Sequence, residues 1–259
     1  MKNKGLMLLV LALILSPFGI EMGLAKERTA AEIITQVDLT MGSDSKTMTQ
    51  EMTLVSASGA SRTREIQLQN RRTGEQDAML VRFLAPADVR GTGLLMTGDD
   101  TWLYLPALGR SRRIAGHAKK GDFMGSDLSF DDMEQLGMTG FGSKFAPTLL
   151  RTEEFQGIQT YVLELSPLDS ESDYSKLVMW VDQERFLPRK IEYVDLEGKL
   201  LKVLHNEDIQ DVAGRWVALA MEMENVQQGT KTMLKVSGVE FDVDIADSVF
   251  TVRSLERGL

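Results

Sequence analysis

Histidine and cysteine, which often serve as catalytic bases, nucleophiles and metal ligands, are scarce or absent in this chain. Its 259 residues include two histidines, His117 and His205, and no cysteine. A serine–histidine–acid site would therefore depend on one of two imidazoles, and there is no thiolate to act as a nucleophile or metal ligand. His117 lies in a stretch rich in glycine and lysine, where a catalytic base would be poorly fixed. His205 follows an apolar run typical of a strand, so we interpret it as a structural residue.

Two pairs of adjacent carboxylates, Asp99-Asp100 and Asp131-Asp132, are the other candidates for catalysis. Two carboxylates hydrolyse a glycosidic bond when they flank it from both sides. The first pair lies in a predicted turn and the second at a predicted helix start, where aspartate is favoured by local hydrogen bonding. The sequence also lacks the G-x-S-x-G, H-E-x-x-H, P-loop and G-x-G-x-x-G motifs. We therefore expect a protein that is not an enzyme and that uses no metal or cofactor.

The charge balance excludes a further class of function. The formal net charge is −9 at pH 7, whereas nucleic-acid-binding proteins carry a basic surface. Such a balance also disfavours a simple electrostatic grip on anionic membranes. One local basic group stands out among glycines: Arg110, Arg112, Arg113, Lys119 and Lys120. It is either a solvated loop or a surface that contacts an acidic lid, lipid head groups or a protein partner.

The N-terminus has the features of a secretory signal peptide. Two lysines precede an almost unbroken apolar run at residues 6–15, and Gly23 and Ala25 place small residues where a signal peptidase cleaves. A run of about ten residues is too short to span a bilayer as an anchor. We predict that residues 1–25 are removed after Ala25 and that residues 26–259 form a single periplasmic domain.

Apolar and polar residues alternate along most of the remaining chain. Residues 48–54 and 217–224 show this clearly, with Met, Leu and Val on one parity. A period of two predicts strands with one buried and one wetter face. Turn residues separate the strands, and most pairs have no helix between them, which indicates an antiparallel sheet of about eleven strands. Capping-box spacings predict a helix over residues 30–42 and a short helix from Ser129 that stops at Gly137.

These elements predict a mainly β (α+β) fold made of one strongly curved antiparallel sheet. The sheet would form an unclosed half-barrel whose concave face is covered by the helices. We expect its inward positions to line an apolar cavity: Met52, Leu54, Ile66, Leu68, Met79, Val81, Phe83, Leu163, Leu219 and Met221. Methionine is frequent, with 15 in the chain, and its flexible side chain adapts to varied guests, although it also fills ordinary cores. The candidate lid residues are Phe123, Met124, Phe130 and Met133.

A longer motif resembles a known family. It comprises residues 83–95 (FLAPADVRGTGLL), 99–110 (DDTWLYLPALGR), 112–114 (RRI), 123–127 (FMGSD) and Phe130. This motif is similar to that of the LolA-like outer-membrane lipoprotein-sorting family, in the branch associated with resistance-nodulation-division transporters. Residues 241–251 (FDVDIADSVFT) resemble that family's ending, a short helical turn that leads into a last strand. The resemblance implies an incomplete β-barrel with a helical lid over a cavity for acyl chains.

In LolA-like carriers an arginine of the barrel holds the lid closed. Arg64 and Arg82 lie on predicted strands, and the sequence does not decide between them. We expect a periplasmic carrier of lipidated proteins or other hydrophobic lipids, monomeric, with an inner-membrane transporter and an outer-membrane acceptor as partners. A lipid-sensing regulatory protein is the alternative, and an envelope hydrolase is a less favoured one.

Overall fold

The computed structural model describes residues 28–73 and 76–258. The predicted signal peptide and its cleavage site at Ala25 lie outside the described residues. The described part contains thirteen strands in one antiparallel sheet. They are β1 (Ser45–Val55), β2 (Ser61–Thr73), β3 (Gln76–Ala85), β4 (Gly93–Thr97), β5 (Asp100–Leu105), β6 (Arg110–Arg113), β7 (Phe145–Phe155), β8 (Ile158–Pro167), β9 (Tyr174–Asp182), β10 (Pro188–Asp195), β11 (Leu200–Val212), β12 (Arg215–Asn225) and β13 (Thr230–Phe241).

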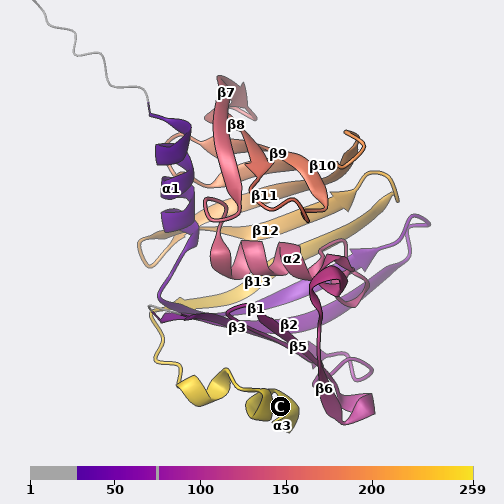
Figure 1. Ribbon diagram of the computed structural model, residues 1–259. Coiled ribbons are helices and arrows are strands. Elements are labelled where there is room, and N and C mark those ends of the chain that lie inside the picture. Colours follow the sequence, from indigo (N-terminus) through magenta and orange to yellow (C-terminus); the bar gives the residue numbers. More distant parts are fainter. Residues whose placement is uncertain (1–27, 74–75, 259) are drawn as a thin grey trace, which may run out of the picture.

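The sheet is open and strongly curved (Figure 1). Its strand order is β6-β5-β4-β3-β2-β1-β13-β12-β11-β10-β9-β8-β7, so β6 and β7 are the edge strands and each pairs with one neighbour. The pairing of β1 with β13 joins the two halves of the chain. The prediction of an unclosed half-barrel is confirmed, but the expected eleven strands were too few. Short strands such as β6, with the sequence Arg-Ser-Arg-Arg, carry no apolar alternation.

Helix α1 (Ala30–Met41) begins and ends where its sequence predicts. The Thr29 hydroxyl accepts a hydrogen bond from the Glu32 amide and Glu32 accepts one from the Thr29 amide, which completes a capping box. Gly42 caps the C-terminus. The apolar face of the helix buries Ile33, Ile34 and Val37, and it packs against β7 and β12 on the concave side of the sheet. None of the helices in the described ranges is long and apolar enough to cross a membrane.

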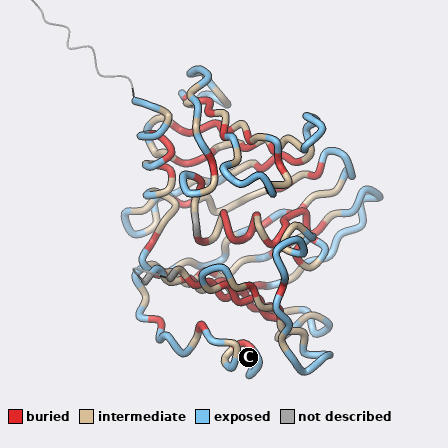
Figure 2. Tube along the Cα trace, in the orientation of Figure 1, coloured by how far each residue is buried: buried red, intermediate tan, exposed pale blue. Residues whose placement is uncertain are grey.

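The segment between β6 and β7 crosses the concave face, and its residues 123–138 are largely buried (Figure 2). We call residues 116–139 the lid. It comprises the 3₁₀ turns η2 (Gly116–Lys120) and η3 (Phe123–Gly125), the helix α2 (Phe130–Glu134) and the π-helical turn η4 (Gln135–Thr139). Ser129 and Asp132 form the predicted capping box. The predicted stop at Gly137 was wrong because this glycine lies inside η4. A Cβ there would stand 2.4 Å from Met79 Sδ, so glycine permits close packing on β3.

The C-terminal segment covers the opposite, convex face of β3–β5 (Figure 1). It contains η5 (Asp247–Val249) and α3 (Val252–Arg257). A second apolar cluster forms there: Ala78, Leu80, Leu95, Ile245, Phe250 and Leu255. The strand expected after the helical turn was a wrong prediction, since Thr251 instead caps α3 by accepting from the Ser254 amide. Both faces of β3 are therefore buried.

Candidate functional site: a lidded apolar cavity

A cavity of about 160 Å³ lies on the concave side of the sheet, beneath the lid. Its wall combines α1, the lid, β1, β2 and the strands β11–β13. Most of the lining is apolar: Met41, Met48, Leu68, Leu128, Met133, Leu136, Leu187, Trp216, Val217, Ala218, Met221, Leu234, Val236 and Phe241, together with Gly137 and the polar Thr40, Lys46, Gln50 and Asn206. The surface therefore suits a hydrocarbon more than a polar metabolite.

The predicted lining residues all lie at or beside this concave core. Leu68 and Met221 line the cavity itself. Seven others are buried in the adjoining hydrophobic cluster: Met52, Leu54, Ile66, Met79, Val81, Phe83 and Leu163. Leu219 is half-buried and packs against the same cluster. The alternation of apolar and polar residues thus locates the inward face of the sheet. Packing of α1 and the lid against that face determines which part of it lines the cavity.

Sequence reasoning missed several lining residues, among them Lys46, Gln50, Leu128 and Leu136. A signal for the first two was present. Lys46 and Gln50 share their parity with Met48 on β1, so they face inward although they are polar. Leu128 and Leu136 belong to the lid on either side of α2, and no strand alternation marks them.

The underside of the lid is an aromatic and aliphatic plug. Phe123 and Leu128 are fully buried, and Phe130 and Met133 are nearly so. The Phe123 ring lies 5.7 Å from Phe83 of β3 and 5.6 Å from Phe130, measured between centroids. Among the predicted lid residues these contacts bring together Phe123 and Phe130, while Met133 lines the cavity. Met124 is half-buried and has a positive φ of 54°.

Polar contacts fasten the first half of the lid to the sheet. Arg64 of β2 donates a hydrogen bond of 2.8 Å to the Met124 carbonyl and also stacks on Phe83. Asp127 accepts hydrogen bonds from Thr230 and Thr232 of β13, and its amide donates to the Thr232 hydroxyl. Of the two candidate arginines, Arg64 therefore contacts the lid.

Arg82 lies on the convex side. Its guanidinium donates hydrogen bonds to the Ser254 and Leu255 carbonyls of α3. Burial lowers the pKa of both Arg64 and Arg82 from the ordinary arginine value. The two arginines thus fasten different coverings on opposite faces of the sheet.

A buried ion pair fastens α2 to the far half of the sheet. Lys202 Nζ of β11 lies 3.1 Å from Asp132 Oδ2, and the two side chains are 7% and 1% exposed. The Tyr174 hydroxyl of β9 donates a 2.8 Å hydrogen bond to Asp132 Oδ1. Burial, followed by the negative charge of Asp132, raises the pKa of Tyr174 well above its usual value. Asp132 thus serves as both helix cap and anchor.

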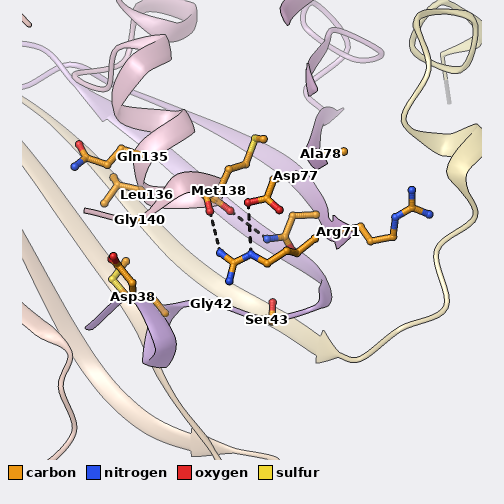
Figure 3. A pocket seen from close by; sticks show the side chains of 14 residues that line it. Asp38, Gly42, Ser43, Arg71, Asp77, Ala78, Gln135, Leu136, Met138 and Gly140 are labelled. Atoms are coloured by element: carbon orange, nitrogen blue, oxygen red, sulfur yellow. Dashed lines mark hydrogen bonds and ion pairs between the residues drawn. The ribbon is translucent and has the colours of Figure 1, made fainter. Parts of the chain in front are cut away.

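The end of the lid meets α1 and β2 in a small polar pocket of about 20 Å³ (Figure 3). Asn70 donates to the Gly137 carbonyl at 3.1 Å, and Arg72 donates to the Met138 carbonyl at 3.2 Å. Asp38 of α1 accepts hydrogen bonds from the amides of Phe141 and Gly142. The pocket shares Met41, Leu136 and Gly137 with the apolar cavity, so the two adjoin.

Part of the basic group contacts acidic residues of the lid and of a nearby loop. Lys119 and Lys144 each place Nζ 3.0 Å from a carboxylate oxygen of Glu134 on α2. Burial alone would raise the pKa of Glu134, but the charges and hydrogen bonds of these two lysines hold it below its usual value. Lys120 pairs with Asp173. Arg110 and Arg112 are exposed on β6.

The candidates for catalysis lie on different elements of the chain. His117 is exposed in η2, and His205 of β11 is half-buried and stacks on Phe155 with 6.4 Å between ring centroids. Burial lowers the pKa of His205. Asp100 pairs with Arg113 across β5 and β6. Over residues 28–73 and 76–258, no three His, Asp or Glu side chains are grouped in a way that could hold a metal ion.

Comparisons with known proteins agree with this architecture. A family model described only as an uncharacterized protein matches residues 75–257. A domain from Vibrio parahaemolyticus, described as an outer membrane lipoprotein-sorting protein domain, is 34% identical with a TM-score of 0.80, over 88% of this chain and 98% of that one. The search of curated proteins gave no match.

Two further solved structures share the fold over nearly their whole length. A DUF1329 family protein from Desulfovibrio piger is 29% identical with a TM-score of 0.82, covering 87% of this chain and 97% of that one. A LolA superfamily protein from Nitrosomonas europaea is 25% identical with a TM-score of 0.72, covering 87% and 98%. The half-barrel, its lid and these relatives together show that the chain belongs to the outer membrane lipoprotein-sorting proteins of the LolA superfamily.

Proposed function

We propose that this protein is a periplasmic carrier that binds the acyl chains of lipids or lipidated proteins beneath its lid. It receives its cargo from an inner-membrane transporter and delivers it toward the outer membrane. The observation that carries the proposal is an apolar cavity on the concave face, covered by a segment whose fastenings are polar. The Vibrio relative, described as a lipoprotein-sorting domain, supports the same class of cargo.

The cavity beneath the lid is partly open to solvent and is too small to bury a whole acyl chain. A void of about 150 Å³ lined by aliphatic and aromatic residues holds a guest the size of benzene, and this cavity measures about 160 Å³. A long chain must therefore displace the plug that Phe123, Leu128 and Phe130 form. Each CH₂ that leaves water contributes about 0.8 kcal/mol, so the incoming chain replaces the apolar contacts that the lid gives up.

Locking the lid tests this proposal. The side chains of Asp127 and Thr230 are in hydrogen-bond contact, and the chain has no native cysteine. Replacing both residues by cysteine places one thiol pair between lid and β13, and loss of free thiols under oxidant verifies that the disulfide has formed. We expect the oxidised double variant to exclude a fluorescent fatty-acyl probe and the reduced protein to take it up. Each single cysteine variant, under the same oxidant, controls for loss of the Asp127 contacts.

The outcomes separate the proposal from its rivals. Uptake that is equal in the oxidised and reduced double variant, or absent from the native protein, would contradict a lidded carrier. Mass spectrometry of organic extracts of protein purified from the periplasm should show acylated species. If lipid is bound but is never transferred to acceptor membranes, the lipid-sensing alternative replaces the carrier.

A further inference from the structure

The apolar cavity contains one formally charged side chain. Of its lining residues in the described part of the chain, Lys46 alone carries a charge. It lies near the start of β1 on the same face as Met48, where it pairs in register with Asn70 of β2 and Phe241 of β13. A lysine on an otherwise neutral inner wall is expensive in an apolar setting unless an anion accompanies it.

Lys46 has no anionic partner among the described residues. No described carboxylate lies within 4 Å of its amine, and the charged group that acts on it is Arg72, which is also positive. Burial, followed by repulsion from Arg72, lowers the pKa of Lys46 to about 8. At neutral pH the amine is therefore still mainly protonated.

The neighbouring polar groups are already engaged. The Gln50 amide donates to Met48 Sδ at 3.0 Å, and the Asn206 amide donates to the Pro188 carbonyl at 2.9 Å. Arg72 is committed to Asp77 and to the Met138 carbonyl of the lid. The ammonium of Lys46 is thus a charged hydrogen-bond donor that remains available to a guest at this end of the cavity.

We propose that Lys46 binds the anionic head of the cargo, so that the cavity favours a single acyl chain that ends in a carboxylate over the same chain with a neutral end. This inference rests on the proposed carrier function and specifies its ligand. One uncompensated cation matches a head with one negative charge, because a dianionic phosphate would introduce a second charge with no available partner. The apolar wall around Met48, Leu68 and Met221 then holds the chain.

Matched ligands and matched variants test this assignment. Binding of myristate and of methyl myristate is measured at pH 7 by displacement of the uncharged probe N-phenyl-1-naphthylamine. The proteins compared are the native chain, Lys46→Met, which keeps the length and apolar stem, and Lys46→Arg, which keeps the charge. A hydrogen bond to a charged group is worth about 1.5–3 kcal/mol, which corresponds to a tenfold to hundredfold change in affinity.

We expect Lys46→Met to bind myristate about tenfold to a hundredfold more weakly, while its affinity for methyl myristate stays within about threefold of the native value. Lys46→Arg should retain the preference for the acid. If Lys46→Met binds both ligands as the native protein does, the role of Lys46 is overturned and the carrier function stands. If the native protein binds neither ligand, the carrier function itself fails. Circular dichroism verifies that each variant is folded.

Discussion

Replacing Lys202 by methionine should loosen the lid selectively. The substitution removes the ammonium that lies 3.1 Å from Asp132 in a buried setting while keeping a side chain of similar length. Breaking a buried ion pair by removing one partner costs about 3–5 kcal/mol, because the remaining charge loses its compensation. Asp132 still accepts hydrogen bonds from Tyr174 and from the Ser129 amide. We therefore expect the lower end of that range, about 3 kcal/mol.

Amide hydrogen exchange of residues 122–139 measures this effect directly. A loss of about 3 kcal/mol raises the population of the opened lid roughly a hundredfold, at 1.4 kcal/mol for each factor of ten. Exchange in these amides should accelerate by that factor. If lid opening limits cargo entry, uptake of the acyl probe should accelerate in parallel.

A second substitution separates loss of the ion pair from loss of packing. Lys202→Met combined with Asp132→Asn removes both charges and keeps an acceptor for the Ser129 amide. The double variant should recover most of the stability that Lys202→Met loses, with a coupling energy of about 2 kcal/mol in chemical denaturation. Two results would refute the anchoring role. One is that the losses of unfolding free energy in Lys202→Met and in Asp132→Asn add up to that of the double variant to within about 0.5 kcal/mol. The other is that the lid amides of Lys202→Met exchange at the native rate.

Three further changes test other parts of the structure. Arg64→Met removes the hydrogen bond to the Met124 carbonyl, so amide hydrogen exchange in η3 should rise tenfold to a hundredfold, equivalent to about 1.5–3 kcal/mol. The matched change on β3, Arg82→Met, should speed exchange in α3 and leave exchange in η3 unchanged. Gly137→Ala brings a Cβ to 2.4 Å from Met79 Sδ, and calorimetry should show a loss of about 1–3 kcal/mol; an unchanged melting temperature would contradict this close approach. The pKa of Lys46 falls from 10.5 to about 8 on folding, so its protonation destabilises the folded state below pH 8, and that penalty disappears between pH 8 and 10.5. Denaturation should therefore show the stability of the native chain rising relative to that of Lys46→Met across this window, by at most about 3.4 kcal/mol. Solvent screening around this partly exposed residue reduces the expected rise to about 1–2 kcal/mol; parallel pH profiles would contradict the shift.

Local patterns predicted the parts of the fold that depend on near neighbours. The capping box at Thr29 and the glycine at 42 set the bounds of α1 because both act within one helical turn. The alternation around Met52 and Val81 correctly identified the inward face of β1 and β3. Gly137 misled the prediction, since its conformational freedom is used for contact with Met79 and not for ending a helix.

The fastenings of the lid could not be predicted from spacing because their partners are remote in sequence. Asp132 has the local signature of a helix cap, yet its other partners, Tyr174 and Lys202, lie 42 and 70 residues away. Arg64 and Arg82 differ in a local signal, because Arg64 shares the parity of the inward Ile66 and Leu68 on β2. Arg82 instead alternates with the inward Val81 and Phe83 on β3. The separate coverings of the two faces then supply their partners, the Met124 carbonyl for Arg64 and the carbonyls of α3 for Arg82.

Placing polar fastenings around an apolar plug gives a carrier a way to release what it binds. In the proposed carrier, the plug and an acyl chain compete for the same concave surface, so exchanging one for the other changes the buried apolar area little. Hydrophobic free energy is roughly proportional to that area. The net affinity then depends on the polar contacts at Arg64, Asp127 and Asp132, which must be broken on loading and re-form on release. Each of these hydrogen bonds contributes about 1 kcal/mol net. Breaking them on loading offsets part of the free energy gained by binding the acyl chain, which keeps binding reversible. A purely apolar lid would lack this opposing term. A chain bound beneath it would be released slowly, because release would transfer the chain from an apolar environment into water with nothing gained by the lid.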